Sequence, residues 1–268
     1  MFRNLLIFIL GSIVGSFLNV CIYRMPKNES IVSPPSHCPN CQRPIPWFYN
    51  IPIVSYVLLK GKCRFCNAKI NFRYLIVELV TAIVFLILFS HYGFSIKFLI
   101  YTGLACSLIV ATFIDFEHQI IPDEITLGGL VIGVLLSILY PPLHTPVSST
   151  LWHGIKSSLI QSVLGIIAGG GAIYLIGVLG TWIFRKDSMG GGDVKLMAML
   201  GSFLGWKFAL LIIILGAFSG SIFGIISLMK NKSHIIPFGP YLSFGAFLCL
   251  LYGDKMLQWI LIYMGIYS

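Results

Sequence analysis

Eight apolar segments of about 20 residues dominate this chain of 268 residues and limit its fold more than any other feature. As helices rising about 1.5 Å per residue, segments of this length cross the hydrocarbon core of a bilayer. Only 10% of the residues are charged, against about 25% in a soluble domain, so a water-soluble globule is excluded. We therefore predict an all-α polytopic membrane protein with about eight transmembrane helices, at residues 5–24, 75–92, 97–114, 125–140, 158–184, 190–206, 208–229 and 240–265.

The basic residues predict how these helices are oriented. With the N-terminus outside, 13 of the 18 Lys and Arg residues fall on the cytoplasmic side and 5 on the other, as the positive-inside rule requires. The longest polar segment, residues 25–73 between the first two helices, is then cytoplasmic. This orientation accounts for the formal net charge of +9. We expect membrane lipid as a partner, and no nucleic acid.

Four cysteines in the cytoplasmic segment form two Cys-x-x-Cys pairs, separated by 21 residues: Cys38 and Cys41, then Cys63 and Cys66. Two such knuckles can place four thiolates tetrahedrally around Zn²⁺. The alternatives are two disulfides or four reduced thiols, and a reducing cytosol disfavours disulfides. Four thiolates leave no open position for water, so the predicted zinc is structural and folds this loop.

Six of the nine carboxylates lie at or near the predicted cytoplasmic ends of the third to sixth helices. Carboxylates beside apolar segments are costly unless they face water, a partner or a site. A proton-coupled carrier usually places its ionisable residues near the bilayer midplane between repeated halves, and we find no internal repeat in this sequence. The distribution favours a site at the cytoplasmic edge of the membrane over a transport pathway.

Two short motifs contain the carboxylates best suited to chemistry. Asp115 ends an apolar segment shortly before Pro122, which disfavours continuation of a helix. Asp193 follows three glycines at residues 190–192 and opens the next predicted helix. Alone, a glycine before a helix-opening aspartate is more often a cap than an active site. Together, the motifs predict two carboxylates that share one water, as in aspartic peptidases, where repulsion raises one pKa.

Other charged residues near these motifs have simpler interpretations. We expect Glu117, Asp123 and Glu124 to lie at solvated helix ends, to cap helices or to attract a basic peptide. Lys195 is expected to meet lipid headgroups or carboxylates at the interface, and not to act as a catalytic amine.

In order and context, motifs along most of the chain resemble the type IV prepilin peptidase family, also called leader peptidase/N-methyltransferase. They are Gly15-Ser16-Phe17-Leu18-Asn19-Val20 with Tyr23-Arg24, both cysteine pairs, Ile45-Pro46-Trp47, Asn50-Ile51-Pro52, Gly61-Lys62-Cys63-Arg64, Arg73-Tyr74, Val77-Glu78-Leu79, both aspartate motifs and Pro237-Phe238-Gly239-Pro240.

The resemblance implies a multi-pass enzyme of the bacterial plasma (inner) membrane with its active site facing the cytoplasm. Such enzymes remove the basic leader from prepilins or pseudopilins of pilus, secretion or competence systems, after a glycine. They typically methylate the new N-terminus with S-adenosylmethionine. Carried over by motif, Asp115 and Asp193 are the catalytic residues. The substrate would join a basic leader to an apolar N-terminal helix.

The resemblance also implies two parts. Residues 1–92, with the four-cysteine loop at 25–73, form the expected methyltransferase part, and residues 93–268 the transmembrane aspartic peptidase domain. Glu78 is the candidate for holding the ammonium of the cofactor or of the new amine, but it could equally pair with Arg24 or Arg73. Asn19 is expected to form an interhelical hydrogen bond.

Two other functions are compatible with parts of this pattern. One is a peptidase that has lost methyl transfer. The other is a non-enzymatic membrane carrier or assembly factor with a zinc knuckle.

Overall fold

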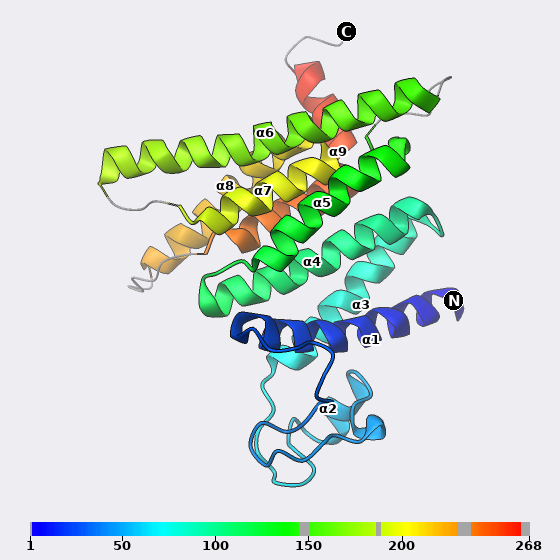
Figure 1. Ribbon diagram of the computed structural model, residues 1–268. Coiled ribbons are helices and arrows are strands. Elements are labelled where there is room, and N and C mark those ends of the chain that lie inside the picture. Colours follow the sequence, from blue (N-terminus) through cyan, green and yellow to red (C-terminus); the bar gives the residue numbers. More distant parts are fainter. Residues whose placement is uncertain (1, 145–150, 186–188, 230–236, 264–268) are drawn as a thin grey trace. The chain divides into compact units, whose positions relative to one another are not determined.

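The computed structural model describes residues 2–144, 151–185, 189–229 and 237–263, and the described residues form helices and loops without a β-strand (Figure 1). The all-α prediction is confirmed. The helices are α1 (Phe2–Arg24), α2 (Val54–Leu58), α3 (Arg73–Tyr92), α4 (Ile96–His118), α5 (Asp123–Leu139), α6 (Leu151–Phe184), α7 (Gly191–Leu204), α8 (Trp206–Met229) and α9 (Gly239–Tyr263), with short 3₁₀ turns at Met25–Lys27, Trp47–Tyr49 and Pro141–Leu143.

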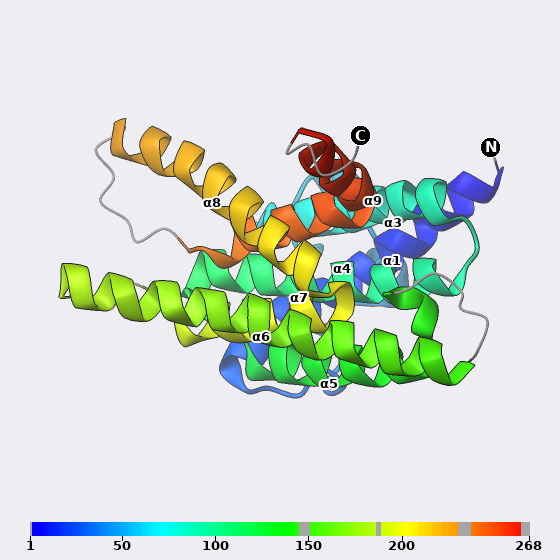
Figure 2. The same ribbon diagram turned by 90° about the horizontal axis from the view of Figure 1, so that it is seen from above.

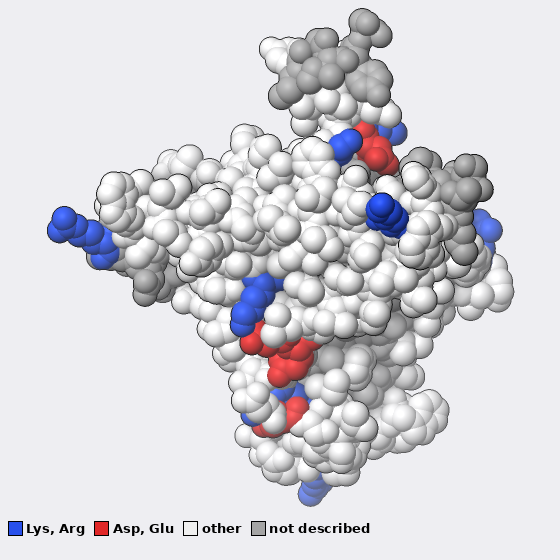
Figure 3. Space-filling view, turned by 45° about the horizontal axis from the view of Figure 1, so that its top comes forward, with Lys and Arg blue, Asp and Glu red and all other residues white. Residues whose placement is uncertain are grey.

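Six helices in the described part of the chain are long and apolar enough to cross a membrane: α1, α3, α4, α6, α8 and α9. The predicted fourth and sixth spans correspond to α5 and α7, which have 17 and 14 residues where about 20 are needed. The predicted count of eight is therefore not confirmed. Many apolar side chains of the long helices face outward, among them Ile167, Leu175, Phe218 and Ile225, and they form broad uncharged surfaces (Figure 3). These are the surfaces of a multi-pass membrane protein.

The chain forms two compact units, which we call the N-terminal unit (residues 1–113) and the C-terminal unit (residues 114–268). In the N-terminal unit, α1 packs closely against α3 through small residues. A Cβ placed on Gly11 would lie 2.7 Å from Cα of Ala82, and one on Gly15 would lie 2.8 Å from Cα of Glu78. Glycines let two helix backbones approach closely where side chains would hold them apart.

In the C-terminal unit, α7 lies alongside α5 and α6 (Figures 1 and 2). Glycines again allow the contact, since Gly129 and Gly133 of α5 face side chains of α7, and Gly165 of α6 meets the backbone of Gly201. The middle of α7 is completely buried, at Leu196, Met197, Met199 and Leu200. A short apolar helix enclosed in this way is a core helix, and Asp193 lies in its first turn.

Candidate active site

Asp115 lies near the end of α4, and its carboxylate is held by the first residue of α9. The side chain is 5% exposed, and the backbone N–H of Gly239 donates a hydrogen bond of 3.1 Å to its Oδ2. A Cβ on Gly239 would lie only 2.6 Å from the same oxygen. Because the N-terminus of a helix presents free N–H groups and partial positive charge, α9 supplies a favourable environment for the Asp115 carboxylate.

The chain turns sharply after Asp115. The backbone N–H of Gln119, which has a φ of 56°, donates to the carbonyl of Asp115 at 3.0 Å and closes α4. Pro122 then precedes α5 as its N-cap residue. The prediction that no helix continues through Pro122 is confirmed, and the turn leaves Ile121 between the two helices.

Asp193 is the third residue of α7 and is 9% exposed. Its backbone N–H donates to the carbonyl of Gly190 at 3.1 Å. Burial, together with the nearby negative charge of Asp115, raises the pKa of the Asp193 carboxyl to about 7. Near neutral pH this carboxyl is therefore protonated for a large part of the time, whereas an exposed aspartic acid would be fully ionised.

One side chain contacts the glycines beside both aspartates. A Cβ on Gly192 would lie 3.2 Å from Cβ of Ile121, and a Cβ on Gly239 would lie 3.1 Å from Cδ1 of the same residue. The structure thus brings together two carboxyl groups that are 78 positions apart in the sequence. Two buried carboxyls with different environments can divide the acid and base roles of one reaction.

Two contacts of this site join residues whose pairing the sequence does not specify. Gly239 is a contact of Asp115 across 124 positions, and its sequence signal is its place in the motif Pro237-Phe238-Gly239-Pro240. The second is an ion pair in which Lys195 Nζ lies 2.7 and 2.8 Å from the two carboxylate oxygens of Asp123. The expectation that Lys195 meets a carboxylate agrees with this contact, while Glu117 and Glu124 are exposed.

The four loop cysteines converge in the N-terminal unit. Their sulfur atoms all lie within 4.8 Å of one another, and all four are free thiols. The sulfurs of Cys38 and Cys66 are 3.8 Å apart, which is close to the edge of a tetrahedron with Zn–S bonds of about 2.3 Å. This cluster could hold a metal ion, and its geometry does not fit the alternative of two disulfides.

Each cysteine knuckle is a tight turn. The N–H of Gln42 donates to the carbonyl of Cys38 at 2.8 Å, and the N–H of Asn67 donates to that of Cys63 at 3.0 Å. Both turning residues have positive φ, of 57° and 56°. The side chain of Asn40 donates to Cys66 Sγ at 3.5 Å. Together with the backbone N–H of Ala68 and the neighbouring thiols, it lowers the pKa of the Cys66 thiol to about 6, which favours the thiolate at this one position.

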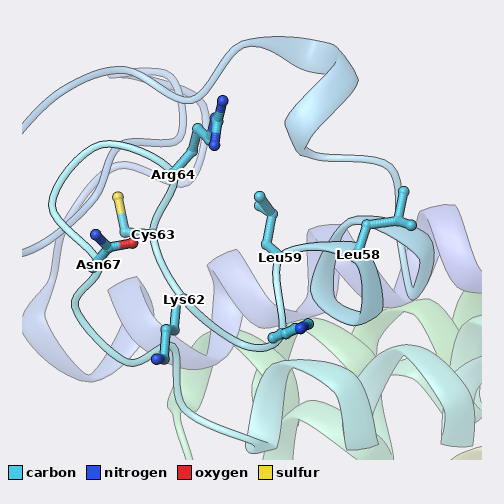
Figure 4. Close-up of a pocket in the computed structure, with 7 residues that line it drawn as sticks. Leu58, Leu59, Lys62, Cys63, Arg64 and Asn67 are labelled. Carbon is cyan, nitrogen blue, oxygen red and sulfur yellow. The ribbon is translucent and has the colours of Figure 1, made fainter.

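Cys63 also lines a small open pocket with six other residues of the loop (Figure 4). Three of them are basic, namely Lys60, Lys62 and Arg64. The pocket thus places positive side chains beside a cluster whose thiolates would carry negative charge.

Glu78 lies where the loop meets α3. It is 7% exposed, its Oε2 accepts a hydrogen bond of 2.7 Å from the backbone N–H of Ile53, and Ser16 also bonds to it. The expected alternative pairing with Arg24 is wrong, because Arg24 donates to the carbonyls of Ser30 and Pro34. In the part of the chain that the structure describes, Glu78 has no ion pair.

Asn19 lies one turn beyond Ser16 on α1 and is 1% exposed. Its Nδ2 donates to the carbonyl of Tyr74 at 3.0 Å, so the predicted interhelical hydrogen bond is confirmed. Its Oδ1 is buried without a hydrogen-bond partner among the described residues. A buried acceptor without a donor is costly, and this oxygen is available to a ligand or a water molecule.

We predict that the cysteine cluster holds zinc and that the metal folds the loop. Cys38→Ser should lower the zinc content measured by mass spectrometry and make residues 25–73 sensitive to limited proteolysis, because binding energy in such loops is folding energy. Cys106→Ser, outside the cluster, is the control and should keep both properties. Unchanged zinc content in Cys38→Ser would contradict the assignment.

Comparisons with known proteins agree on one family. Residues 9–92 match the model described as the bacterial peptidase A24 N-terminal domain, and residues 102–225 match that of the type IV leader peptidase family. Several relatives are named prepilin leader peptidase/N-methyltransferase. The relative from Aeromonas salmonicida is 34% identical to this chain, and the match covers 96% of this chain and 93% of the relative. That of Pseudomonas aeruginosa is 33% identical over the same shares, and that of Legionella pneumophila 31%, over 98% and 96%. No solved structure matches.

Proposed function

The chain belongs to the type IV leader peptidase family, and we propose that it removes the basic leader of prepilins or pseudopilins with Asp115 and Asp193 as catalytic residues. Cleavage occurs after a glycine at the cytoplasmic face. The chain is a peptidase with methyltransferase activity, and the new N-terminus is the acceptor of the methyl group. The observation that carries the catalytic assignment is the buried carboxyl pair arranged around Ile121.

The pair supports hydrolysis by an activated water molecule. One carboxylate takes a proton from water while the water oxygen adds to the scissile carbonyl carbon, and the protonated carboxyl donates to the carbonyl oxygen. When the C–N bond breaks, a proton passes to the leaving amine, so no covalent enzyme intermediate is needed. Asp193, with its pKa of about 7, is suited to the acid role. Asp115, bonded to the N–H of Gly239, is suited to the base role.

The substrate and the site have matching properties. A basic leader joined to an apolar helix lies across the membrane interface, so partitioning into the bilayer contributes to recognition. In the predicted eight-helix topology, 13 of the basic residues lie on one side of the membrane, which supports a cytoplasmic position for the helix ends that carry the aspartates. We assign the protein to the bacterial inner membrane on the same grounds.

We assign methyl transfer to residues 1–92 and cleavage to residues 93–268, in line with the separate family models that match residues 9–92 and 102–225. S-Adenosylmethionine would supply an electrophilic methyl group for the new amine. The polar groups at the α1–α3 contact fit a cationic ammonium, because Glu78 is buried without an ion pair among the described residues and Asn19 Oδ1 is an open acceptor. Glu78 would therefore hold the ammonium of the methyl donor or of the new N-terminus.

Reconstitution with a prepilin whose basic leader ends in glycine tests this function. Leader release and methylation of the new N-terminus are followed by mass spectrometry in the presence of S-adenosylmethionine. Asp115→Asn and Asp193→Asn should each lower cleavage by about 10²- to 10⁴-fold, the usual range for loss of an acid or base. Asp254→Asn, an exposed aspartate of α9, is the control and should cleave like the parent.

The outcomes separate the alternatives. Cleavage by both site variants at the rate of the parent would reject the aspartate pair. Cleavage without methylation would show a peptidase that has lost methyl transfer.

Gly239→Ala should also lower cleavage, because its Cβ would lie 2.6 Å from Oδ2 of Asp115 and must displace the carboxylate. Shifts of about 1 Å at a reacting group can cost on the order of 100-fold in rate. Gly128→Ala is the matched control, since nothing lies within 4 Å of its Cβ position. If the two alanine variants cleave equally fast, the contact between Gly239 and Asp115 has no role in the reaction.

A further inference from the structure

We propose that Asp123 and Lys195 are positioning residues for leader cleavage, because their ion pair fixes the first turn of α7, and with it Asp193, beside the turn that follows Asp115. Asp123 is the first residue of α5, and Lys195 is the fifth of α7. Each lies two residues from the part of the site that it serves, Ile121 and Asp193 respectively. This inference rests on the proposed function.

The start of α7 has few side chains with which to anchor itself. Gly190, Gly191 and Gly192 precede Asp193, and the N-cap residue makes no side-chain hydrogen bond. A glycine run has the largest conformational freedom of any sequence, yet Asp193 must keep a constant position for catalysis. Lys195 is the first side chain after Asp193 that binds another helix of the C-terminal unit through a charge.

The geometry of the pair suits an anchor. Lys195 Nζ bonds both oxygens of the Asp123 carboxylate, at 2.7 and 2.8 Å. A lysine in the first turns of a helix is opposed by the positive end of the helix dipole, whereas an aspartate at the first position of α5 is favoured by it. The Asp123 carboxylate therefore compensates a lysine that α7 alone would disfavour.

The exposure of the pair decides where its effect should be seen. The side chains of Lys195 and Asp123 are 41% and 55% exposed. Exposed ion pairs contribute little to global stability, so loss of this pair should change the reaction rate and leave unfolding of the protein almost unchanged.

A double-mutant cycle tests the proposal with variants that remove charge and keep size. Asp123→Asn and Lys195→Met should each lower kcat for leader cleavage by about tenfold, through displacement of Asp193. The double variant should be no slower than either single one, because the two side chains act as a unit. KM should stay within about twofold of the parent, the thermal midpoint should not move, and Lys195→Arg should retain activity.

Glu124→Gln is the matched control. It removes one exposed negative charge next to Asp123 without breaking the pair, and it should leave kcat unchanged.

Three results would overturn the proposal: single variants with the kcat of the parent, additive losses in the double variant, or a loss confined to KM that depends on the charge of the leader. The last would show that Asp123 binds the leader. A parent protein that does not cleave prepilin would instead reject the proposed function, so the two failures are distinguishable.

Discussion

Two carboxyl groups buried close to each other repel, and the C-terminal unit is arranged to hold them together against that repulsion. Asp115 receives a backbone N–H from the start of α9, and Asp193 keeps a proton at a higher pH than an ordinary aspartic acid. Each device lowers the cost of burial for one member of the pair. The same devices make the two groups chemically different, which acid–base catalysis requires.

Close packing of helix backbones keeps Asp115 and Asp193 in place. Glycines at positions 129, 133 and 165 let α5 and α6 enclose α7, and glycines at 192 and 239 leave space for Ile121. A larger residue at either of the last two positions would push Ile121 or the Asp115 carboxylate aside. These glycines therefore help to set the distance between the two aspartates.

The sequence predicts much of this arrangement, because the deciding interactions are local. Pro122 marks the end of the segment that contains Asp115, and the spacing of the four cysteines predicts their cluster. Two contacts join distant positions: sequence reasoning missed that of Gly239 with Asp115, and it predicted a carboxylate near Lys195 without identifying Asp123. Hydropathy also cannot separate a helix that faces lipid from one enclosed by protein, so it does not reveal that the middle of α7 is buried.

The most direct test of the account is the proximity of positions 115 and 193 in the membrane. In the background for this test, Cys21, Cys106 and Cys249 are replaced by alanine and the loop cysteines are retained. Asp115→Cys is then combined with Asp193→Cys. A short bis-maleimide should join the two new cysteines, and mass spectrometry should detect the linked peptide. Asp115→Cys with Lys255→Cys is the control and should not be joined, because Lys255 lies 16 residues after Gly239 along α9, about 24 Å as a helix. Absence of a link between positions 115 and 193, in protein whose cysteines are accessible to the reagent, would contradict the shared site.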